Sequence, residues 1–243
     1  MEPLNHTCSP VYPTIRILGA FLISLAIIST PAMASKGYGK SADVAKTTAT
    51  GLDKDEIAHL TFMREEEKLA RDVYLTLSRM YPEQNVFSVI ATQSEQTHTD
   101  TIRDRLQQFG LPDPNPNTND LPDSIGVFTG SEWGWYFEEK FKELTQAGSE
   151  YELAALYVGA LIEELDMHDI ADCPQVMVEA GYKDPCGLRY TDERAIINAY
   201  RSLIDGSENH LRAYVGQIEA VIGEGKYAAQ FLTQDEVDAI LGR

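Results

Sequence analysis

The sequence predicts an all-α protein, arranged as a four-helix bundle with a long crossover between its second and third helices and short additional helices. In four long stretches, apolar residues recur every three or four positions, which is the period of a helix with one buried face. Runs that alternate between apolar and polar residues, as in a half-buried strand, do not occur over any length. Proline and glycine separate the stretches, as at Pro82, Gly110 and Gly148.

The overall composition is that of a soluble globular domain, with 43% hydrophobic and 24% charged residues in a chain of 243. The formal net charge is −18, whereas a protein that binds nucleic acid presents a basic surface. We therefore expect no nucleic-acid partner. The acidity suits a protein that meets metal ions, and solubility alone explains it equally well.

The N-terminal segment has the pattern of a signal peptide. Arg16 is followed by the apolar run ILGAFLISLAII and then by Ala32-Met33-Ala34, a small-x-small cleavage pattern. Because the run is short for a membrane span, we expect a signal peptide at 1–34, export to the periplasm or beyond the cell, and no membrane contact after cleavage. An uncleaved anchor is the alternative. A flexible linker (35–51) then leads into the folded domain, 52–242.

The first helix is expected from about Asp53, a plausible N-cap, to Met80. Its inward stripe consists of Leu60, Met63, Ala70, Tyr74 and Leu77. Glu67 occupies the missing place in that stripe, whereas Glu65 and Glu66 are expected to face solvent or basic partners. The alternative is that all three glutamates form a solvated face.

The second helix, from about Phe87 to Leu106, carries Glu95 and His98 on one face because they are three residues apart. The apolar members of that face are Phe87, Ile90, Ala91, Ile102 and Leu106. A carboxylate and an imidazole therefore point toward the core. Burying a charged carboxylate is costly unless it has a partner, and a metal ion suits both groups.

The proline- and asparagine-rich stretch 111–123 predicts a crossover rather than a helix or strand. Ser131 is expected to cap a short amphipathic helix over Glu132–Gln146, whose aromatic residues form a packing face. The third helix is expected over Glu150–Ile170. Glu163 and Asp166 interrupt its inward apolar stripe, while Glu164 and His168 point sideways or outward.

Two cysteines, Cys173 and Cys186, remain after removal of the signal peptide. An even number of cysteines in an oxidising compartment predicts a disulfide, with a soft metal site as the alternative. Thr191 is expected to cap the fourth helix, Asp192–Ile222.

His210 lies on the inward stripe of that fourth helix, and Ser207 precedes it by three residues. A lone histidine on an apolar face is more often a hydrogen-bonded core residue than a ligand, so the metal interpretation of His210 depends on the other helices. Thr233 and Glu236 then predict a capping box for a short terminal helix.

Several segments resemble known families. Glu67-Lys-Leu-Ala-Arg71 and Glu95-Gln-Thr-His98 resemble the ligand segments of the first two helices of rubrerythrin-type proteins. EEEKLARDVY, GALIEELDMHDI and SENHLRAY together resemble the ferritin-like family called domain of unknown function 2202. This resemblance implies a helical bundle and no established activity.

The resemblance also implies a metal-ligand set, which consists of Glu67, Glu95, His98, Glu163 and His210, with Asp166 as a possible sixth member. The chain departs from the two-iron pattern at Ser207, where a glutamate would stand. Tyr74, Ser207 and Tyr214 lie on the inward stripes beside the ligands. There the two tyrosines either donate hydrogen bonds to the ligands or relay electrons, or they are core residues with a satisfied hydroxyl.

We expect one or two ions of iron or manganese, which accept mixed oxygen and nitrogen ligands. A metal-dependent oxidoreductase acting on dioxygen, peroxide, ferrous iron or a small organic molecule follows from that expectation. The alternatives are a non-catalytic helical module with a buried polar network, and an interaction protein that uses the aromatic residues between Trp133 and Phe141.

Overall fold

Residues 51–243 are the part of the chain that the computed structural model describes. Every regular element in this part is helical, which confirms the all-α prediction. None of its helices combines the length and the apolar character needed to cross a bilayer. The expected signal peptide (1–34) and all but the last residue of the expected linker (35–51) lie outside the described residues.

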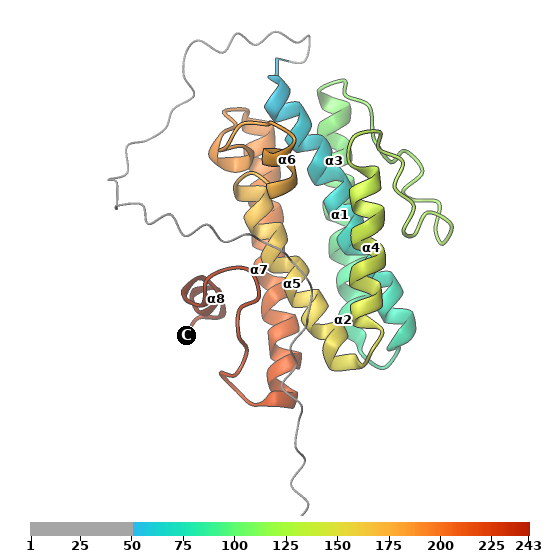
Figure 1. Cartoon of the computed structure of the whole chain (residues 1–243), viewed down its shortest axis with the longest axis vertical. Coiled ribbons are helices and arrows are strands. Elements are labelled where there is room, and N and C mark those ends of the chain that lie inside the picture. The colour runs from blue at the N-terminus through green and yellow to red at the C-terminus, as the bar shows by residue number, and fades with distance from the viewer. Residues whose placement is uncertain (1–50) are drawn as a thin grey trace, which may run out of the picture. The chain divides into compact units, whose positions relative to one another are not determined.

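Helix α1 (Lys54–Met80) is the element to which most of the others attach, as Figure 1 shows. Its N-terminus forms the predicted cap: the Asp53 side chain accepts hydrogen bonds from the amides of Asp55 and Glu56, and the Glu56 side chain accepts one from the amide of Asp53. This reciprocal capping box satisfies amides that would otherwise lack partners at the start of the helix.

The second predicted helix is interrupted. It consists of α2 (Asn85–Val89), a π-helical turn η1 (Ile90–Glu95) and α3 (Gln96–Gln108). A π turn inserts one residue into the helical ladder, and such turns are frequent at functional sites. The α3 helix ends as predicted before Gly110, whose positive φ of 67° allows the Leu111 amide to donate back to the carbonyl of Leu106.

Three further helices complete the core. Helix α4 (Gly134–Gly148) and α5 (Glu152–Ala171) pack on each other, and α5 runs alongside α7 (Arg194–Ile222) (Figure 1). Two N-caps lie two residues later than predicted, at Trp133 instead of Ser131 and at Glu193 instead of Thr191.

The shorter elements lie around this core. The loop between α5 and α7 contains α6 (Gln175–Glu179) and the 3-10 turn η2 (Gly187–Arg189), and a disulfide joins Cys173 to Cys186 across it. The terminal helix α8 (Gln234–Leu241) begins with the predicted capping box.

One carboxylate of α5 accepts several hydrogen bonds from the C-terminal segment. Glu164 accepts hydrogen bonds from the Tyr227 hydroxyl at 2.6 Å and from the amides of Phe231 and Leu232 at 2.6 and 2.9 Å. The helical period predicts that Glu164 points sideways or outward. Its side chain is completely buried, because the C-terminal segment covers it.

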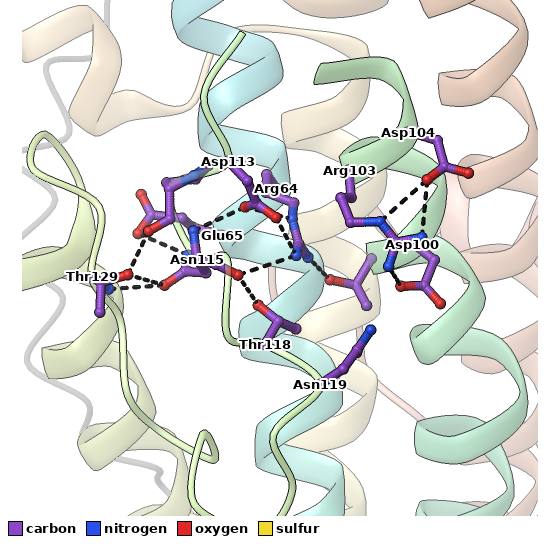
Figure 2. A network of polar contacts seen from close by, with 12 residues as sticks. Arg64, Glu65, Asp100, Arg103, Asp104, Asp113, Asn115, Thr118, Asn119 and Thr129 are labelled. Carbon is purple, nitrogen blue, oxygen red and sulfur yellow. Dashed lines mark hydrogen bonds and ion pairs between the residues drawn. The ribbon is translucent and has the colours of Figure 1, made fainter. Parts of the chain in front are cut away.

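The crossover between α3 and α4 covers the polar side of α1 (Figure 2). The Arg64 guanidinium donates two hydrogen bonds to Asp113 at 3.0 and 2.9 Å, and the Asn115 amide donates to Glu65 at 3.3 Å. We predicted that Glu65 and Glu66 face either solvent or basic partners. Neither faces solvent, because both side chains are buried. The crossover covers Glu65, whereas Glu66 lies near Asp169 and Asp166 of α5.

Two arginines in Figure 2 allow the buried crossover contact to be compared with a surface ion pair. The Arg64 side chain is 1% exposed, whereas Arg103, which pairs with Asp100 and Asp104, is 36% exposed. We expect Arg64→Ala to lower the free energy of unfolding by about 3–5 kcal/mol, because it leaves buried polar partners unpaired. Arg103→Ala should cost less than about 1 kcal/mol. Urea unfolding measures the free energy of unfolding of both variants. Equal, small decreases would contradict the role of Arg64 in holding the crossover on α1.

Candidate metal centre

Acidic and imidazole side chains from four helical segments meet inside the fold. They come from α1, from the η1–α3 segment, from α5 and from α7, and all of them are buried: Glu67, Glu95, His98, Glu163, Asp166 and His210. These are the six residues that the sequence analysis expected at metal-ligand positions.

Five of the six form two groups that share one residue. The Glu67 group consists of Glu67, Glu95 and His98, and the Glu163 group consists of Glu95, Glu163 and His210. Within each group, one donor atom from every residue lies within 4.8 Å of the others. This spacing is compact enough for each group to hold a metal ion.

Glu95 presents a different oxygen to each imidazole. Its Oε1 lies 2.9 Å from Nδ1 of His210, and its Oε2 lies 3.4 Å from Nδ1 of His98. The same Nδ1 atoms lie 3.2 Å from Oε2 of Glu163 and 3.3 Å from Oε2 of Glu67. Glu95 therefore belongs to both donor groups and offers a different oxygen to each imidazole.

Several donor atoms of the centre lack a hydrogen-bond partner. Within residues 51–243, both carboxylate oxygens of Glu67 and Nδ1 of His98 are buried and make no hydrogen bond of good geometry. Buried polar atoms without partners are rare and costly, so each calls for an explanation. A bound cation would satisfy all three atoms at once.

Burial and neighbouring charges determine how these groups hold protons. Burial alone lowers the pKa of His98, but the Glu95 and Glu67 carboxylates outweigh it and raise this pKa to about 12. Glu163 and Glu95 likewise outweigh burial and raise the pKa of His210 to about 10. Burial raises the pKa of Glu67 to about 7. Burial alone would also raise the pKa of Glu95, yet the two imidazoles hold it well below its usual range.

Asp166 lies beside the two groups without belonging to either. The Ser207 hydroxyl contacts its Oδ2, while its Oδ1 is buried with no hydrogen-bond partner in the described part of the chain. Burial, together with the charge of Glu67, raises the pKa of Asp166 well above its usual range. Asp166 therefore keeps a free oxygen near Glu67, where it can act as a further donor.

Two hydroxyl groups contact the Glu163 group from outside. The Tyr74 hydroxyl donates to Oε1 of Glu163 at 2.6 Å, and the Ser94 hydroxyl lies 2.7 Å from Nε2 of His210. The sequence analysis expected Tyr74 in a supporting position but missed Ser94, whose orientation depends on the π turn. The Tyr214 ring packs 5.3 Å from that of Tyr74, and its hydroxyl makes no hydrogen bond to the described residues.

A glycine on α7 leaves room for one of the imidazoles. A Cβ atom at Gly206 would lie 2.4 Å from Nε2 of His98, far closer than real atoms approach. The absence of a side chain at this position therefore allows α7 to lie against the His98 ring. The ring centres of His98 and His210 are consequently only 5.4 Å apart.

The remaining buried or half-buried histidines of the described chain have structural contacts. His59, which the sequence analysis did not single out, bonds through Nδ1 to the Tyr200 hydroxyl at 2.7 Å and through Nε2 to the Asp169 carbonyl at 2.8 Å. These contacts join α1, α5 and α7. His168 lies away from the centre and contacts Asp169, and its side chain is 38% exposed.

Comparison with known proteins identifies relatives over nearly all of the described chain. The family model described as "Uncharacterized protein domain (DUF2202)" matches residues 56–243. The uncharacterised protein MJ0754 of Methanocaldococcus jannaschii is 37% identical over 190 residues, which cover 78% of this chain and 88% of that protein. The crystal structure of hypothetical protein MJ0754 from Methanococcus jannaschii is similar at a TM-score of 0.64 and 36% identity, and the match covers 79% of this chain and 94% of that one. The chain therefore belongs to the uncharacterised DUF2202 family.

Proposed function

We propose that this protein is an exported, ferritin-like metalloprotein that holds two ions of iron or manganese and uses them in redox chemistry. The observation that carries the proposal is the position of Glu95, which offers one oxygen to each of the two donor groups. Inward glutamates combined with a Glu-x-x-His segment are the ligand pattern of bundles that hold two metal ions. The disulfide between Cys173 and Cys186 supports an oxidising location outside the cytoplasm.

The donor set favours iron or manganese over softer ions. Carboxylates together with imidazoles suit these metals, whereas thiolate ligands favour zinc or copper(I), and both described cysteines are in the disulfide. When bound, such ions supply one-electron chemistry toward dioxygen, peroxide or a small reductant.

The charges of the site also support divalent ions. Four buried carboxylates, from Glu67, Glu95, Glu163 and Asp166, surround two imidazoles. Protonated imidazoles can offset only part of the negative charge that these carboxylates carry when they are ionised. Metal binding removes protons from the ligands and replaces them with the charge of the ion, so divalent ions suit this acidic set.

A non-catalytic polar network is the alternative, and one observation favours it. Ser207 stands on α7 where a second Glu-x-x-His segment would place its glutamate, and its hydroxyl contacts Asp166. In that case the imidazoles would carry protons permanently, and the centre would only connect the helices. Metal content and redox reactivity separate the two functions.

The first prediction concerns metal content. We expect the protein purified without chelators to contain close to two ions per chain, and Glu95→Gln to lose both, because Glu95 belongs to both donor groups. Glu65→Gln is the matched control, since Glu65 is equally buried but faces the crossover. Elemental analysis of the three proteins measures the effect. Equal metal content in Glu95→Gln and the unaltered protein would contradict the proposal.

The second prediction concerns redox reactivity. The protein loaded with Fe²⁺ without oxygen should change its near-ultraviolet absorbance on mixing with dioxygen or peroxide. The change should exceed that of free Fe²⁺ and be absent in Glu95→Gln. If the loaded protein shows no change beyond free Fe²⁺, the structural alternative holds.

The third prediction uses two glycines of α7. An alanine at Gly206 overlaps the His98 ring, whereas nothing lies within 4 Å of a Cβ at Gly216. We expect Gly206→Ala to weaken Mn²⁺ binding by about 10–100-fold, the range seen when the surroundings of a ligand are altered. Gly216→Ala should leave binding unchanged and raise the free energy of unfolding by about 0.5–1 kcal/mol. Calorimetric titration and thermal unfolding measure both, and unchanged binding of two Mn²⁺ ions by Gly206→Ala would argue against His98 as a ligand.

A further inference from the structure

We propose that the two donor groups are unequal: the Glu163 group takes the first ion and holds it more tightly, and the Glu67 group takes a second, exchangeable ion. This inference rests on the proposed function, because it presupposes that both groups bind metal. Its basis is the difference in the hydrogen bonds that hold each group from outside.

On the Glu163 side, a tyrosine fixes the carboxylate. The Tyr74 hydroxyl donates to Oε1 of Glu163 at 2.6 Å, and both side chains are completely or almost completely buried. With Oε1 held in this way, Oε2 is the oxygen that faces His210, at 3.2 Å from its Nδ1. The carboxylate therefore already has the orientation in which it can bind an ion.

A serine does the same for the imidazole of this group. The Ser94 hydroxyl lies 2.7 Å from Nε2 of His210, which leaves Nδ1 directed at Glu95 and Glu163. A partner on the outer nitrogen of a histidine ligand fixes both the ring orientation and the nitrogen that binds the ion. Ser94 directly precedes Glu95 at the end of the π turn, so η1 provides both the shared carboxylate and the partner of His210.

The Glu67 group has no comparable support. Within residues 51–243, neither carboxylate oxygen of Glu67 makes a hydrogen bond, and neither does Nδ1 of His98. The outer nitrogen of His98 faces Gly206, which has no side chain to hold it. Asp166 is held by Ser207, but it lies outside the compact group.

This difference has a direct consequence for affinity. An ion that binds to side chains already held in place loses less free energy to ordering them than one that must order them itself. Outer hydrogen-bond partners of metal ligands contribute about 10–100-fold to affinity. The Glu163 group should therefore bind its ion at least about tenfold more tightly than the Glu67 group.

The test is a calorimetric titration of the ion-free protein with Mn²⁺ in the absence of oxygen. We expect two binding steps that differ at least tenfold in dissociation constant. Tyr74→Phe and Ser94→Ala should each weaken the first step by about 10–100-fold. Glu67→Gln should abolish the second step and leave the first in place, whereas Glu163→Gln should abolish the tighter step.

The matched control is Tyr81→Phe. It removes a hydroxyl that donates at 2.9 Å to the Gly148 carbonyl, outside the centre, and it should leave both steps unchanged. Two equal steps, or an unchanged first step in both Tyr74→Phe and Ser94→Ala, would overturn this inference while leaving the proposed function intact. Complete absence of Mn²⁺ binding would overturn the proposed function and this inference with it.

Discussion

The burial of several carboxylates close together is the constraint on which the rest of this structure depends. Glu67, Glu95 and Glu163 converge from three helical segments, and each would be costly to bury alone. The cost of burying these carboxylates falls only if positive charge lies among them. His98 and His210 lie close enough to Glu67 and Glu95 to supply it when they are protonated. The inward faces of the long helices therefore have to balance buried charges as well as pack apolar side chains.

A second polar layer on α1, beside the centre, contains charged side chains that are paired in a different way. There the buried positive charges are guanidinium and ammonium groups, and the crossover and α1 itself supply their partners: Arg64 pairs with Asp113, and Asp72 pairs with both Lys68 and Arg71. These groups are paired within the protein, so they leave no buried charge for an ion to satisfy. The centre differs because several of its buried donor atoms make no hydrogen bond within the described chain.

The helical period accounts for much of what could be predicted from the sequence. Spacing along each helix placed Glu67, Glu95 and His98 on inward faces, and the structure brings them together. It could not predict the π turn, because the insertion of one residue leaves no clear sign in a short polar run such as Ile90–Glu95. The burial of Glu164 was equally unpredictable, because it depends on a segment more than sixty residues later folding over it.

The π turn gives the asymmetry of the centre a physical origin. On α7, the Ser207 hydroxyl contacts Asp166, and Glu95 is the residue that the two donor groups share. The turn that positions Glu95 also directs Ser94 toward His210 and not toward His98. The π turn therefore provides Glu95, which the two groups share, and Ser94, which supports only the Glu163 group. An α-helix in its place would turn Ser94 and Glu95 relative to α7, and the arrangement of both groups depends on that register.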